Sequence, residues 1–180
     1  MITLLLFAVT SAAVATSGIP PCVPVASDDL APTSSAIEDH RALREALGEP
    51  MPTAQTMVMV FGRGGHLSTE EYSVILARDA NDVWNGTAVG RRRISVKDAP
   101  FVLMKRMKWV LDKERSEKLE DAISRRCPFD RSVAFNRESG PPPLGYISER
   151  IDIILPRRST LTYHASEGDG KIASLIRPPE

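Results

Sequence analysis

The stretch from Met57 to Val96 constrains the fold most, because it holds two consecutive strand-like runs and the start of a third. The first run, 57–61, is continuously apolar and leads into a glycine-rich segment, 62–65, which is typical of a buried strand that enters a turn. In the second run, 71–79, apolar residues alternate with largely polar ones, which indicates a strand with one face in the core.

A hairpin loop is predicted at 80–82, because Asn and Asp tolerate left-handed backbone geometry and bond to their own backbone. In the following run, 83–96, apolar side chains fall mostly at even positions and polar ones at odd positions. Gly86 and Gly90 interrupt the even face, and their spacing predicts either a bulge or room for the ring of Trp84 against the backbone. The whole stretch therefore predicts an antiparallel meander.

A short amphipathic helix is predicted before the meander. Ser35 and Glu38 have the spacing of a capping box, which marks the start of a helix. The apolar residues that follow share one stripe, and Gly48 then ends the helix.

After the meander, the run 101–111 fits either a strand or a helix, and we favour a strand from about Arg106. The reason is Asp112, which suits the N-cap of a separate helix over 113–126. A carboxylate and two arginines at the two ends of that helix would also complement its dipole.

Two more strands are predicted near the end of the chain, at 146–155 and 160–164, while 172–176 is too short to assign. Strands with helices inserted between them, rather than strict alternation, indicate an α+β fold. We expect an antiparallel β-meander sheet with one or two helices packed on one face.

A signal peptide is predicted over 1–15. Its apolar run, 2–9, has signal-peptide length, and a small-x-small pattern ends at Ala15, where we expect cleavage. The alternatives are a buried N-terminal element and a membrane anchor, for which the run is shorter than the roughly twenty residues required. After cleavage we expect no stable membrane insertion, an extended or disordered segment over 16–34, and a single α+β domain over 35–180.

Export would place Cys22 and Cys127 in an oxidising compartment, periplasmic or extracellular, where two thiols tend to form a disulfide. The bond would tie the N-terminal segment to the end of the second helix. In the chain-entropy model, a disulfide that closes a loop of this length stabilises the folded chain by roughly 4 to 5 kcal/mol. The alternative is two unpaired thiols, one on a disordered tail and one buried.

Acidic and basic residues balance at 23 each, so no overall field draws the chain toward nucleic acid or an anionic membrane. Two basic clusters nevertheless stand out. If they lie on neighbouring strands, they would form a surface for an anion or an acidic envelope partner. The alternative is a solvated strand edge whose charge prevents edge-to-edge pairing. The clusters are Arg91, Arg92 and Arg93, and Lys105, Arg106 and Lys108.

No motif predicts a catalytic residue, a cofactor or a metal. The loop 62–65 lacks the Gly-Lys-Ser/Thr of a phosphate loop, and His40, His66 and His164 lack the close spacing of zinc ligands. A G-x-S-x-G elbow is also missing from the sequence. We therefore expect a non-catalytic exported binding module of the cell envelope, either an inhibitor or an accessory subunit.

The alternative is a small exported hydrolase whose acid and base are scattered in the sequence. A deep pocket that holds two such groups with shifted pKa values would favour the enzyme. A flat or convex face with exposed aromatic residues would favour the binding module. The candidate acids and bases are Glu71, Asp79, Asp152 and His164.

Overall fold

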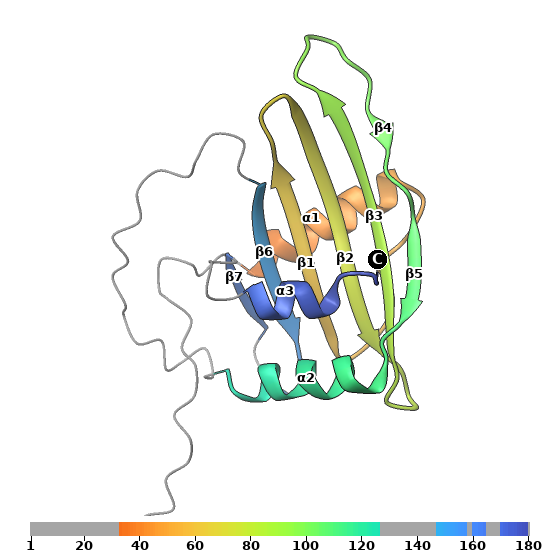
Figure 1. Cartoon of the computed structure of the whole chain (residues 1–180), viewed down its shortest axis with the longest axis vertical. Coiled ribbons are helices and arrows are strands. Elements are labelled where there is room, and N and C mark those ends of the chain that lie inside the picture. Colours follow the sequence, from red (N-terminus) through yellow and green to blue (C-terminus); the bar gives the residue numbers. More distant parts are fainter. Residues whose placement is uncertain (1–32, 127–146, 158–159, 165–169, 180) are drawn as a thin grey trace, which may run out of the picture.

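The computed structural model describes residues 33–126, 147–157, 160–164 and 170–179. There the chain forms one antiparallel sheet, with strand order β4-β3-β2-β1-β6-β7 and β5 also paired to β3 (Figure 1). The strands are β1 (Met57–Gly64), β2 (Ser68–Arg78), β3 (Trp84–Ile94), β4 (Val102–Leu103), β5 (Met107–Val110), β6 (Ile147–Ile154) and β7 (Leu161–His164). The helices are α1 (Thr33–Ala46), α2 (Lys113–Ser124) and α3 (Gly170–Ile176).

The N-terminal features predicted from the sequence lie outside the described residues. These are the signal peptide, all but the last two residues of the 16–34 segment, and Cys22. Cys127 also lies outside, immediately after the described part that contains α2.

β1, β2 and β3 form the predicted meander, with unbroken antiparallel ladders between them. The β2–β3 hairpin turns at the predicted loop, where Oδ1 of Asp79 accepts the backbone N–H groups of Asn81 (2.9 Å) and Val83 (3.0 Å). Asp82 has a φ of 63°, the left-handed geometry that Asp tolerates. The meander and its hairpin loop are confirmed.

Two glycines in the sheet make room for aromatic rings from neighbouring strands. A Cβ on Gly62 would lie 2.1 Å from Cζ of Tyr72, and a Cβ on Gly86 would lie 2.1 Å from Cε2 of Trp109. Two predictions are therefore corrected. β1 continues through Gly62, so the turn follows residue 64 instead of starting at 62. The room at Gly86 serves Trp109 in place of Trp84, and the ladder there is regular instead of bulged.

The sheet carries helices on both faces. Even-numbered side chains of the meander, such as Val60 and Leu76, pack with α2 and α3 in the larger core. Odd-numbered ones, such as Phe61 and Val89, pack with Leu43 of α1. The α+β fold is confirmed, with two helices on one face of the sheet, and α1 adds a third layer on the opposite face (Figure 1).

α1 begins at Thr33, two residues before the predicted start at Ser35. Ser35 and Glu38 thus both lie inside the helix, because the residues before Ser35 continue it. Gly48 follows the helix with a φ of 68°, as expected for a glycine that ends one.

The run 101–111 is extended and contains β4 and β5, so the favoured strand is confirmed. Asp112 caps α2 as predicted, since its Oδ1 accepts the backbone N–H of Arg115 at 2.8 Å. α2 ends at Ser124, two residues earlier than expected. The two late strands are also confirmed, and the segment that was too short to assign lies in α3.

Candidate functional site

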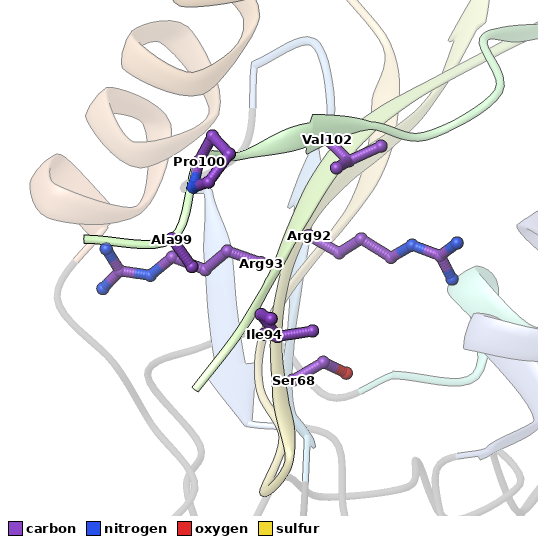
Figure 2. Close-up of a pocket in the computed structure, with 7 residues that line it drawn as sticks. All are labelled: Ser68, Arg92, Arg93, Ile94, Ala99, Pro100 and Val102. Carbon is purple, nitrogen blue, oxygen red and sulfur yellow. The ribbon is translucent and has the colours of Figure 1, made fainter. Parts of the chain in front are cut away.

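The two predicted basic clusters lie on neighbouring strands. Arg91, Arg92 and Arg93 belong to β3, which pairs with both β4 and β5, and the second cluster runs from the β4–β5 connection into β5. Successive side chains of a strand point to opposite faces, so Arg91 and Arg93 share the face of α1 while Arg92 lies on the other. Figure 2 shows Arg92 and Arg93 pointing apart. The clusters therefore do not form one single-sided patch.

Three of the six cations are held by carboxylates of this chain. Nη2 of Arg91 lies 2.7 Å from Oε2 of Glu71. Nζ of Lys108 lies 3.0 Å from Oε1 of Glu49, and Nη1 of Arg106 lies 3.9 Å from its Oε2. The hydrogen bond from Lys108 is the main reason why the pKa of Glu49 is lowered. These contacts tie β3 and β5 to β2 and to the end of α1.

The other three cations, Arg92, Arg93 and Lys105, have no carboxylate within ion-pair distance in the part of the chain that the structure describes. Arg93 instead lies over the ring of Phe101, with 4.9 Å from its guanidinium carbon to the ring centroid. Arg91 covers the same ring at 4.2 Å. Phe101 is thus stacked with two cations at the edge of the sheet.

Exposed apolar side chains are concentrated at the end of the sheet that carries Arg92 and Arg93. Of the eight large hydrophobic residues that are exposed in the described chain, six lie at this end of the sheet, with exposed fractions from 40% for Phe101 to 80% for Leu67. A concentration of this kind is typical of an interaction site, since single apolar residues are usually scattered. The distal surface consists of these six residues and two arginines: Leu67, Ile94, Val96, Phe101, Val102, Leu103, Arg92 and Arg93.

The distal surface contains a hollow of about 440 Å³. It forms because the pairing of β3 with β4 stops at Arg92 and Val102, after which the connecting chain departs from the sheet. A left-handed residue in that connection, Asp98 with a φ of 61°, helps it turn. The hollow is lined by Ser68, Arg92, Arg93, Ile94, Ala99, Pro100 and Val102 (Figure 2).

A second polar cluster is buried beneath α1. Nδ1 of His40 lies 2.8 Å from Oγ of Ser73 on β2, and Nε2 lies 3.1 Å from Oδ2 of Asp152 on β6. All three residues have an exposed fraction of 0%. Because β1 separates β2 from β6, His40 joins two strands that do not pair with each other.

Burial lowers the pKa of His40 and outweighs the hydrogen bond and charge of Asp152, so the buried site favours the neutral ring. A neutral ring donates from Nε2 to Asp152 and accepts at Nδ1 from the Ser73 hydroxyl. Arg44 donates to Oγ of Ser73 and Arg150 donates to Oδ2 of Asp152, each at 3.4 Å. These five residues form the buried array, in which successive donors lead to the Asp152 carboxylate.

The buried array has the residue types of a Ser-His-Asp triad without the access that catalysis requires. A nucleophilic serine must reach a substrate carbonyl, yet Ser73 is enclosed between α1 and the sheet. The sequence points to Asp152 as an acid or base but not to Ser73 or His40 as its partners. One signal was available, because His40 stands three residues after Ile37 on the apolar stripe, where a polar group needs partners.

The remaining acid and base candidates lie apart. Glu71 is paired with Arg91, and Asp79 closes the β2–β3 hairpin, where the backbone N–H of Val83 is the largest cause of its lowered pKa. His164 ends β7, at the edge of the sheet opposite to β4. Within the described residues, no three His, Cys, Asp or Glu side chains are grouped as metal ligands would be.

No family model, curated protein or solved structure matches this chain. Among the described residues, no helix has both the length and the apolar character needed to cross a bilayer.

Proposed function

We propose that this protein is a non-catalytic, exported binding module that contacts a protein partner in the cell envelope through the distal surface, as an inhibitor or an accessory subunit. The observation that carries the proposal is that six exposed apolar side chains lie at the same end of the sheet as Arg92 and Arg93, and that two of these side chains line a hollow with the arginines. Protein interfaces combine an apolar centre with enriched aromatic residues and arginine, and Phe101 stacked with arginines has that composition.

A protein partner fits this surface better than nucleic acid or a lipid bilayer. Contact with phosphates requires several lysines and arginines directed at one side. Here Arg92 and Arg93 lie on opposite faces, Arg91 is paired with Glu71, and the whole chain has no net charge. The distal surface offers apolar area with a few directed cations, which suits an acidic and partly apolar protein surface.

Co-purification tests the proposal. The tagged chain and two variants would be produced in cells of the source organism, and the proteins recovered with each would be quantified by mass spectrometry. The double variant Leu67→Ser/Leu103→Ser should lose a protein that the wild type retains, and the control Val83→Ser should keep it, since Val83 is exposed in the hairpin at the other end of the sheet. The purified partner should then bind the purified chain. Equal recovery with both variants would contradict the proposal.

Export and the Cys22–Cys127 disulfide form part of the same proposal. The intact mass of the chain from a cell-envelope fraction should begin at Thr16, and alkylation of thiols should add mass only after reduction. A full-length chain that alkylates without reduction would contradict both.

The hydrolase alternative is supported by one observation, the hydrogen bonds that join Ser73, His40 and Asp152. Catalysis there would require α1 to leave the sheet. A fluorophosphonate probe, which labels activated serines, tests this directly. We expect no modification of Ser73 in the folded chain, and labelling that disappears in Ser73→Ala would support the hydrolase.

A further inference from the structure

We infer that the partner contributes an extended, acidic and partly apolar segment that pairs with the outer edge of β4 and adds a strand to the sheet. This inference rests on the proposed function and specifies how the distal surface would be used. It follows from three features of the edge: free backbone groups, cations on both faces, and the hollow beside β4.

The outer edge of β4 has backbone groups available for pairing. The N–H of Met104 bonds to the carbonyl of Gly90 on β3 at 2.9 Å, so by alternation the backbone groups of Leu103 and Phe101 point away from β3. Within the described part of the chain, β4 is the last strand in the sheet order. An incoming strand could therefore form main-chain hydrogen bonds there, as in other cases of strand addition.

The positions of Arg92 and Arg93 favour strand addition over a partner that lies on one face of the sheet. Arg92 and Arg93 have no carboxylate partner among the described residues, and they point to opposite faces of the sheet. A helix or flat surface on one face would reach only one of them. An added strand directs alternate side chains to both faces, about 10 Å from β3 and within reach of an arginine.

Apolar side chains accompany the cations on each face. Val102 lies on the face of Arg92, opposite it in the ladder, and Leu103 lies on the face of Arg91 and Arg93. Both residues are exposed, and the hollow adjoins Val102. The segment that fits would therefore present at least one acidic and one apolar side chain to each face.

The positive charge at the β4 edge disfavours pairing of this edge with a second copy of the chain. Lys105 is exposed beside β4, and two β4 edges placed together would bring like charges close. An acidic segment would be attracted where another copy is repelled, which is why we assign the edge to a different chain.

Synthetic peptides test the inference. The probe is a blocked, fluorescent octapeptide of repeated Glu-Glu-Val-Val, which places Glu and Val on both faces of a strand, and its counterpart replaces Glu by Lys. Fluorescence anisotropy with the purified chain should show saturable binding of the Glu peptide alone. Arg92→Glu/Arg93→Glu should weaken that binding by about tenfold or more, because close charge pairs of this type couple strongly. The control Lys118→Glu, on the exposed side of α2, should leave it unchanged.

Backbone methylation then separates strand pairing from charge attraction. One version of the Glu peptide carries N-methyl groups at two consecutive central residues, which places a methyl group on each edge of the strand in any register, and a second version carries them at alternate residues only, which leaves one edge free to pair. We expect the first version to lose binding and the second to keep it.

Equal binding of both methylated versions, binding of the Lys peptide, or no binding at all would overturn strand addition. Dimerisation of the chain itself at β4, detected by light scattering, would overturn the acidic segment as occupant. None of these results bears on the co-purification of a partner, so the proposed function can survive the loss of this inference.

Discussion

The helix-covered half of the sheet and its distal end differ in which side chains they bury. In the helix-covered half, even arginine is buried: Arg44 has an exposed fraction of 1%, and its guanidinium donates to Thr87 at 2.9 Å. At the distal surface, Ile94, Val96 and Leu103 remain exposed, and two arginines have no carboxylate partner in the described chain.

This difference indicates that one region determines stability and the other determines binding. A buried polar group destabilises the fold unless it is hydrogen-bonded, so the loss of a donor or acceptor from the buried array should destabilise the packing of α1 on the sheet. An exposed apolar side chain contributes little to folding, so the distal surface can be shaped by binding. Substitutions should therefore change stability in one region and partner binding in the other.

The largest effect on stability is expected for Asp152→Ala. The substitution removes the acceptor of the buried His40 N–H, while Arg150 keeps its ion pair with Asp39, and it should lower the free energy of unfolding by about 2 to 3 kcal/mol. Urea unfolding would measure the change. The control Asp121→Ala removes only the exposed pair with Arg125 and should cost less than about 1 kcal/mol. Equal losses would contradict the role of the buried array.

The next largest effect is expected for Gly86→Ala, whose Cβ would overlap the ring of Trp109 on β5. Overpacking of this kind should cost about 1 to 3 kcal/mol in urea unfolding. In a Trp109→Ala background the same change should be neutral or stabilising, since the ring is gone and alanine suits a strand better than glycine. A cost that persists in that background would show that Trp109 is not the cause.

Stability should also depend on pH through His40. Its pKa is lower in the folded chain than the ordinary 6.5, so between the two values the unfolded chain binds a proton that the folded chain excludes. The stabilisation is fully present above pH 6.5 and declines below it, by at most about 1.4 kcal/mol per pH unit. A proton on His40 would lie near Asp152 but also near Arg44 and Arg150, two cations that oppose it.

The comparison of wild type with His40→Gln isolates this dependence, because other titrating groups are common to both proteins. The advantage of the wild type in unfolding free energy should shrink as the pH falls from 8 to 5. An advantage that stays constant over that range would contradict a neutral, buried His40.

The smallest change in stability is expected at the distal surface. Leu67→Ser and Leu103→Ser should each alter the free energy of unfolding by no more than about 0.5 kcal/mol, as Val83→Ser should, because all three side chains are already exposed. If either distal variant lowered the free energy of unfolding by more than about 2 kcal/mol, the distal surface would be part of the structural core instead.

Local patterns in the sequence were sufficient for most of the fold. A continuous apolar run predicted the first strand of the meander and alternation predicted the other two, and the Asp112 cap decided between strand and helix before α2. The clustering of arginines also marked the strand that carries the distal surface. These features depend on residues close together in the chain, which is why they can be read without the structure.

Features that depend on distant residues could not be predicted in the same way. The ring that fills the space at Gly86 comes from Trp109, on a strand beyond the next turn, so Trp84 was chosen wrongly. His40 and Asp152 are 112 residues apart, and only the order of β2, β1 and β6 brings them together. The exposure of Val102 and Leu103 likewise depends on where β4 stops pairing.

Site-specific photo-crosslinking in living cells tests the central claim most directly. A photo-reactive amino acid would replace Leu103 in the distal surface or, as a matched control, Val83 at the opposite end of β3. The account predicts a covalent adduct from position 103 with the protein that co-purifies with the wild type, and little or none from position 83. Adducts of equal yield from both positions, or from position 83 alone, would contradict a binding surface at the distal end.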